Sequence, residues 1–113
     1  MAPLDAADEV PSGTGILVVK RGPNAGSRFL LNQPATSAGS HPASDIYLDD
    51  ETVSRHHAEF HCDGTEFRLV DVGSLNGTYV NGELVQTTQL HNGDEVEIGR
   101  FRLMFLLARS SRT

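Results

Sequence analysis

Short apolar runs that are cut by turn residues, with no helical periodicity, most constrain what this chain can fold into. No stretch keeps apolar residues at the i, i+3, i+4, i+7 spacing of an amphipathic helix. Runs such as Ile16–Val19 and Phe67–Val70 are instead bounded by Gly, Asn, Asp and Pro. Many short strands separated by turn residues are typical of a β-sandwich or barrel. The sequence therefore predicts an all-β fold whose function lies in the connecting loops.

Alternation and turn signals predict the individual strands. In the segment Ala58–Cys62, residues Ala58, Phe60 and Cys62 alternate with polar ones and are expected to face the core. Asn81-Gly82 is a strong two-residue hairpin signal. The other predicted strands cover residues 16–19, 28–31, 67–70, 79–80, 96–98 and 101–105. We expect all the phenylalanines to be core residues, namely Phe29, Phe60, Phe67, Phe101 and Phe105.

Length and charge exclude several classes of protein. The chain has 113 residues and a mass of 12.2 kDa, which suits one domain. Lys and Arg number 9 against 15 Asp and Glu, for a net charge of -6. Binding to nucleic acid or to an anionic membrane relies on surplus cationic charge, so we expect neither partner. A local cationic site for one anion stays compatible with this balance.

We expect one folded domain over residues 14–108, with a flexible acidic tail at 1–13 and a loose C-terminal tail at 109–113. The N-terminal segment has no apolar core and is not a signal peptide. The single cysteine, Cys62, cannot form an internal disulfide, which favours a reducing cytoplasmic location. We further expect a monomer.

Three predicted loops are rich in hydrogen-bonding side chains. They cover residues 38–46, 50–57 and 71–78. Together they offer Ser hydroxyls, the Arg55 guanidinium, the Asn76 amide and backbone N–H groups. A phosphate dianion has several strong acceptor oxygens and is best held by charge-assisted hydrogen bonds. Loops of this composition suit a phosphate group if the fold brings them together.

Motifs in and after these loops resemble the successive signatures of forkhead-associated (FHA) domains. The motifs are Ser54-Arg55-His56-His57, the segment Asp71–Gly82 and the segment Leu90–Gly99. They occur in order within residues 15–107, and several independent motifs are more specific than one. The resemblance implies an FHA-type β-sandwich of about eleven short strands, with loops at one edge that bind phosphothreonine peptides.

The resemblance also implies a role for each motif residue. Ser54 would bind the phosphate through its hydroxyl and backbone, and Arg55 would approach the same anion or the peptide main chain. Leu75 stands where many members have a phosphate-binding Thr, which leaves an apolar contact. The implied phosphopeptide-binding residues are Ser40, Ser54, Arg55, Ser74, Leu75 and Asn76, and the implied loop-supporting residues are Gly39, His57 and Gly77.

Ser40 departs from the family pattern, in which the first motif is a Gly followed by an Arg that is a main phosphate ligand. A hydroxyl in place of that guanidinium loses a charge-assisted anchor, which typically costs about 2–5 kcal/mol. Three explanations stay open. Arg55 or Arg28 partly compensates, the domain binds partners without phosphate, or Ser40 is an engineered change that silences the site. We favour a site of intact shape with a weakened phosphate grip.

The segment Leu17–Leu31 resembles the corresponding segment of a narrower group within the family, the actinobacterial glycogen accumulation regulator and its oxoglutarate dehydrogenase inhibitor relatives. The resemblance implies a signalling module in Ser/Thr kinase pathways that regulates enzymes of central carbon and nitrogen metabolism. Its partners would be phosphothreonine proteins, a Ser/Thr protein kinase and metabolic enzymes. The alternative is a phosphate-independent inhibitor that uses the same loops.

Members of that group carry an N-terminal threonine segment that kinases phosphorylate and that then folds back onto the phosphate site. Residues 1–13 contain no threonine, so we expect this autoinhibitory switch to be missing from the chain.

Two chemical alternatives are weaker. Ser54, His57 and Asp71 have the residue types of a hydrolytic triad, but no Gly-x-Ser-x-Gly elbow surrounds Ser54. His57, Glu59 and His61 would share one strand face at a zinc-ligand spacing, although a solvated face is the simpler interpretation. We therefore predict no catalytic residue, no metal site and no cofactor.

Overall fold

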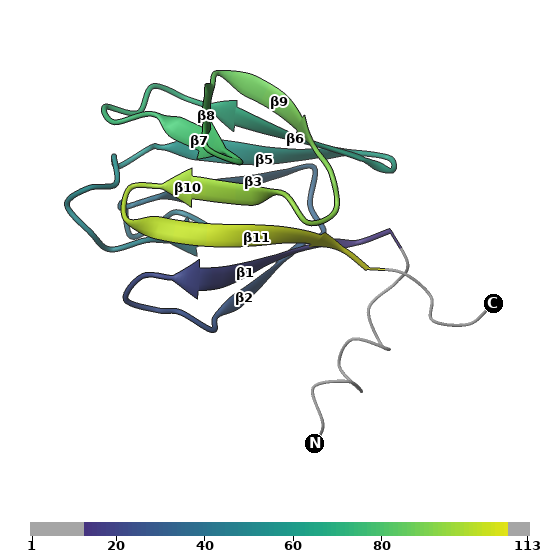
Figure 1. The fold of residues 1–113 in the computed structure, drawn as a ribbon, viewed down its shortest axis with the longest axis horizontal. Helices are drawn as coiled ribbons and strands as arrows, with labels where there is room; N and C mark the ends of the chain where they lie inside the picture. Colours follow the sequence, from purple (N-terminus) through teal and green to yellow (C-terminus); the bar gives the residue numbers. More distant parts are fainter. Residues whose placement is uncertain (1–12, 109–113) are drawn as a thin grey trace.

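Two β-sheets stack on one another in the computed structural model, which describes residues 13–108 (Figure 1). The predicted tails therefore lie almost wholly outside the described residues. The six-stranded sheet has the order β2 (Arg28–Leu31), β1 (Gly15–Arg21), β11 (Phe101–Leu107), β10 (Glu95–Ile98), β7 (Thr78–Val80) and β8 (Glu83–Val85). The five-stranded sheet has the order β4 (Ile46–Tyr47), β3 (Ala35–Gly39), β5 (Ala58–Asp63), β6 (Glu66–Asp71) and β9 (Thr87–Leu90). The described residues contain no helix that could cross a membrane.

The core lies between the sheets and follows the alternation of the strands. Along β11, Phe101, Leu103 and Phe105 are buried, while the residues between them are half-buried on the other face. Phe67 of the opposite sheet meets Phe105 with ring centroids 5.2 Å apart. Of the five phenylalanines only Phe29 is not fully buried, and it still packs against the core. The predicted all-β fold and aromatic core are confirmed.

Every predicted strand overlaps a strand of the structure, but the sequence pattern missed β3, β4, β8 and β9. These strands are only two to five residues long, so none of them shows the sustained alternation or apolar run that marks a strand; Ala35–Gly39 also consists of small residues, and Thr87–Leu90 carries Thr and Gln instead of an apolar run. The predicted hairpin is present between β7 and β8. Asn81 and Gly82 both have positive φ, 52° and 86°, as a type I′ turn requires.

Strand register places the three polar loops at one end of the sandwich. Ala38, Ala58 and Asp71 pair in a single row across β3, β5 and β6. Beyond this row the chain enters the β3–β4, β4–β5 and β6–β7 loops, which lie at the left in Figure 1. The frame therefore brings together segments that are far apart in the sequence.

We expect Phe105→Ala to lower the free energy of unfolding by about 3–5 kcal/mol, because it leaves a cavity between the sheets beside Phe67. Urea denaturation followed by circular dichroism measures the change. Met104→Ala is the matched control, since Met104 lies half-buried on the outer face of the same strand. An equal loss in both variants would contradict this account of the core.

Candidate functional site

Backbone hydrogen bonds join the β3–β4 and β4–β5 loops. Ser40 N donates to the Ser54 carbonyl at 3.0 Å, and His41 N donates to the Arg55 carbonyl at 3.3 Å. Gly39 makes this approach feasible, because a Cβ at this position would overlap the Arg55 carbonyl oxygen. The predicted loop-supporting position of Gly39 thus has a steric basis in the structure.

The β6–β7 loop closes onto the same segment. Leu75 N donates to Ser54 Oγ at 2.9 Å, and Asn76 Nδ2 donates to the Thr52 carbonyl at 3.2 Å. Leu75 is 89% exposed, and the side chains of Arg55 and Asn76 are also exposed. The structure therefore brings five of the six predicted binding residues to one junction of three loops, with polar donors and one leucine at its surface.

His57 supports this junction from inside. Its side chain is fully buried, Nδ1 accepts from Ser54 N at 3.1 Å, and Nε2 lies 2.9 Å from the Gly77 carbonyl oxygen. An acceptor at Nδ1 requires the neutral tautomer with its proton on Nε2, which donates to Gly77. Burial lowers the pKa of His57, which favours this neutral form.

The hydrolase alternative requires His57 to accept a proton from the Ser54 hydroxyl. In the structure the imidazole bonds the Ser54 backbone and not its hydroxyl, and the other ring nitrogen is committed to Gly77. The arrangement has no general base for a serine nucleophile.

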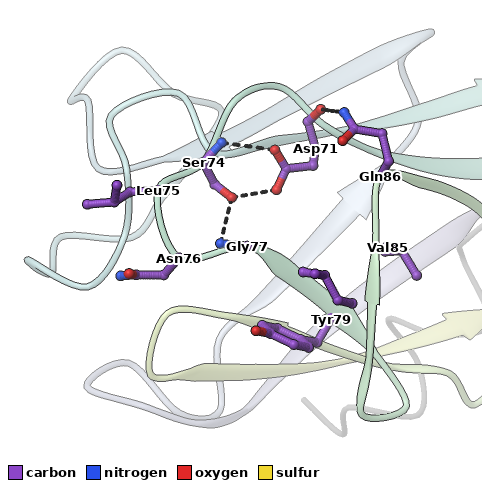
Figure 2. Close-up of a pocket in the computed structure, with 9 residues that line it drawn as sticks. Asp71, Ser74, Leu75, Asn76, Gly77, Tyr79, Val85 and Gln86 are labelled. Atoms are coloured by element: carbon purple, nitrogen blue, oxygen red, sulfur yellow. Dashed lines mark hydrogen bonds between the residues drawn. The ribbon is translucent and has the colours of Figure 1, made fainter.

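Asp71 organises the β6–β7 loop from the end of β6 (Figure 2). Its carboxylate accepts from Gly73 N at 2.8 Å, Ser74 N at 2.9 Å, Ser74 Oγ at 2.5 Å and Thr78 Oγ1 at 2.8 Å. Burial alone would raise the pKa of Asp71, but these hydrogen bonds outweigh it and lower the pKa to about 2. The carboxylate is therefore ionised at neutral pH and fixes the loop that presents Leu75.

Ser74, the sixth predicted binding residue, directs its hydroxyl inward. The hydroxyl donates to Asp71 and accepts from Gly77 N at 2.9 Å. In this structure the Ser74 side chain therefore supports the β6–β7 loop and is not one of the donors at the junction.

The sequence analysis missed a second supporting cluster on the β4–β5 loop. Asp50 accepts from Thr52 N at 2.9 Å and from the Thr52 hydroxyl, and it pairs with Arg100 Nε at 3.3 Å. Thr52 Oγ1 also accepts from Arg100 N at 3.0 Å, which fastens the β10–β11 turn to this loop. The Asp-x-Thr spacing is a local turn signal, but nothing in it points to the distant Arg100.

A cleft of about 440 Å³ lies between the β6–β7 loop and β8 (Figure 2). Leu75, Tyr79, Leu84 and Gln86 line it together with the Asp71 network, and Leu84 is 65% exposed. The residues on its β7–β8 side were not predicted, because an outward Tyr79 or Leu84 looks like any exposed strand residue. The cleft extends the junction over the neighbouring sheet.

One expectation about a histidine is corrected, and one about an arginine stays a prediction. Arg28, considered as a substitute for the missing arginine, lines a cleft with Asp45 and Ile46. His57 does not share a strand face with Glu59 and His61, because it is buried before β5 begins. Within residues 13–108 no group of three His, Cys, Asp or Glu side chains is arranged to hold a metal ion.

Comparison with known proteins identifies matches over most of the chain. The FHA domain family model matches residues 36–99. The glycogen accumulation regulator GarA of Mycolicibacterium smegmatis is 66% identical over 108 residues, which cover 96% of this chain and 68% of the relative. GarA of Mycobacterium tuberculosis is 65% identical over 91% of this chain, which spans only 64% of that relative. The oxoglutarate dehydrogenase inhibitor of Corynebacterium efficiens is 65% identical, with 88% of this chain and 70% of the relative covered.

A solved FHA structure is also similar. It comes from a structural and functional analysis of phosphothreonine-dependent FHA domain interactions, with a TM-score of 0.78, 31% identity, and coverage of 83% of this chain and 96% of that chain. The names of the sequence relatives describe a regulator and an inhibitor, in agreement with the expectation of a non-catalytic protein.

The Asp71 network makes a prediction about pH. Because the folded pKa of about 2 lies below the ordinary 3.8, the ionised carboxylate stabilises the fold above pH 3.8, and this contribution is lost as the pH falls toward 2. We expect Asp71→Asn to lower the free energy of unfolding by up to about 2 kcal/mol at neutral pH, with the gap closing between these two values. Denaturation at a series of pH values measures it.

Asp63→Asn is the control for Asp71→Asn, because Asp63 is an exposed carboxylate in the β5–β6 hairpin. A gap between the parent chain and Asp71→Asn that stays constant down to pH 2 would contradict the assigned hydrogen-bond network.

Proposed function

Because the chain belongs to the FHA domain family, we propose that it is a non-catalytic regulator that binds phosphothreonine segments of partner proteins at the junction of its three loops. The observation that carries the proposal is the contact between Ser54 and the β6–β7 loop, with Arg55 beside it. This contact supplies clustered donors for an anion on a buried support.

The donors match the needs of a phosphate dianion. Ser54 Oγ accepts the Leu75 N–H, so its own hydroxyl hydrogen is left to donate outward. Arg55 is the only Lys or Arg residue in the three loops, so it supplies their only permanently charged cationic group. The exposed Leu75 offers an apolar surface for the methyl group that distinguishes threonine from serine. Asn76 would hold the peptide backbone next to the phosphorylated residue.

We propose that Ser40 weakens the binding of phosphate at this junction. Its backbone lies at the junction through the bond to Ser54, but its side chain is a hydroxyl and carries no charge. Of the residues in the three loops, only Arg55 would offer a phosphate a guanidinium. Since charge-assisted bonds are about twice as strong as neutral ones, we infer a site of the right shape with reduced affinity.

The partners that we propose follow from the relatives. Their names describe glycogen accumulation and the inhibition of oxoglutarate dehydrogenase, so we propose that this chain acts on enzymes of central carbon metabolism. The link to nitrogen metabolism and to a Ser/Thr kinase is what the family resemblance adds to this proposal. A second candidate is phosphate-independent inhibition through the same surface. The exposed Leu75 and Leu84 favour it, because apolar side chains beside a cleft can dock a protein that carries no phosphate.

We expect a phosphothreonine peptide to bind at least tenfold more tightly than the same peptide with unmodified threonine, because only the phosphate can use the charge-assisted bonds of Ser54 and Arg55. Isothermal titration calorimetry with the two peptides measures the ratio. Ser54→Ala should abolish the preference, and Ser44→Ala, in the β3–β4 loop, should keep it. Equal binding of both peptides, or binding only of a whole unphosphorylated enzyme, would favour the second candidate.

We also expect Ser40→Arg to strengthen binding of the phosphothreonine peptide at least tenfold, because it adds a second guanidinium to the junction. Ala43→Arg is the matched control: it adds the same charge to an exposed position of the same loop. If the two variants gain equally, general electrostatic attraction explains the effect and Ser40 is not the weak point.

A further inference from the structure

Two histidines stack at the junction and have no part in the roles given above. The rings of His41 and His56 lie with centroids 5.5 Å apart and planes inclined by 19°. His41 follows Ser40 directly and His56 follows Arg55 directly, and the two loop segments are held together by the bonds Ser40 N to Ser54 O and His41 N to Arg55 O. The stack is therefore attached to the two segments that carry the weakened phosphate site.

The two rings differ in what they can do. His41 Nδ1 accepts from Ala43 N at 2.9 Å, which fixes its proton on Nε2 and makes it a neutral donor. His56 is exposed, and its ring makes its contact with His41. A proton on Nδ1 of His41 would break the hydrogen bond that this atom accepts from Ala43 N, whereas the His56 ring has no such hydrogen bond to lose among the described residues. Only one ring of the pair is thus suited to take up charge.

No carboxylate within residues 13–108 is in salt-bridge contact with His56, although the exposed Asp49 and Glu51 lie on the same loop. Within residues 13–108 the histidine rings that pair with carboxylates are His61, with Glu59, and His91, with Asp94. The other ionisable groups around the stack are Asp45, Asp49, Asp50, Glu51, Arg55 and His57 in the two loops and Asp71 at the end of β6. The hydrogen bonds described above occupy Asp50, Asp71 and His57, and Asp45 accepts from Ser37 N at 2.9 Å.

We propose that His41 and His56 complete the phosphate site, with His41 as a neutral donor and His56 as a cation that takes up a proton from solvent when the dianion binds. A bound dianion favours a positive charge beside it, and imidazole is the side chain whose ordinary pKa lies close enough to neutrality to respond. The pair would supply in part the charge that Ser40 does not. The inference rests on the proposed phosphothreonine function.

The test is calorimetry of the phosphothreonine peptide with the parent chain and His56→Gln at about pH 6, 7 and 8. The peptide phosphate also titrates near pH 6, but it does so equally for both proteins, so the ratio of their dissociation constants isolates His56. We expect His56→Gln to bind roughly tenfold more weakly at about pH 6 and nearly as well as the parent at about pH 8. His56→Arg should keep tight binding across the range.

Repeating the titrations at about pH 7 in buffers of different ionisation enthalpy counts the protons exchanged. The parent should take up protons, while His56→Gln should release the fraction that leaves the peptide phosphate. His61→Gln is the matched control, because it removes a histidine that pairs with Glu59 on the side of β5 and should leave both measurements unchanged. His41→Gln should weaken binding at all three pH values.

The possible results distinguish a failure of the role proposed for His56 from a failure of the proposed phosphothreonine function. A parent chain that binds the phosphopeptide through Ser54, with a ratio of parent to His56→Gln that does not change with pH, would overturn the role of His56 alone. A parent chain that fails to distinguish the phosphorylated from the plain peptide at every pH would overturn the proposed function and this inference together.

Discussion

A neutral imidazole buried between two loops is the interaction on which the binding surface depends. His57 accepts the backbone N–H of Ser54 and donates to the carbonyl of Gly77, so it joins the β4–β5 loop to the β6–β7 loop through one rigid ring. Ser54 and Leu75 can then meet at a fixed distance above it. Both ring nitrogens must keep opposite roles, which only the neutral form provides. The donors of the surface therefore owe their positions to a fully buried side chain.

The loops are rigid although they contain no regular secondary structure, because side chains replace the missing ladder bonds. Asp71 takes four donors in the β6–β7 loop, and Asp50 with Thr52 ties the β4–β5 loop to Arg100. A site that is ordered before binding loses less conformational entropy when a ligand arrives. Such preorganisation is worth most where few charges are available to hold a ligand.

The sequence predicted the fold class and the aromatic strands, because inward apolar residues at every second position, as in Phe101, Leu103 and Phe105 of β11, are visible as an alternation in the sequence. It also pointed to the loop junction, since Ser54 and Asn76 belong to recognisable motifs. It could not give the Thr52–Arg100 contact or the cleft beside Leu84, which depend on segments distant in sequence. Nor could it tell that the Ser74 hydroxyl points inward, because that depends on where the Asp71 carboxylate lies.

A chain with a net charge of -6 can still present an anion site, because short-range donors decide the outcome at one junction while distant charges are screened. The surrounding acidic residues then add selectivity: they disfavour polyanions, which would contact a wide area, more than a single phosphate on an otherwise neutral or basic segment. Arg55 is the one Lys or Arg within the three loops, and Arg100 is tied to the β4–β5 loop through Asp50. Under our proposal that Ser40 weakens phosphate binding, single side chains around it would have more effect on affinity than in a site that already held two arginines.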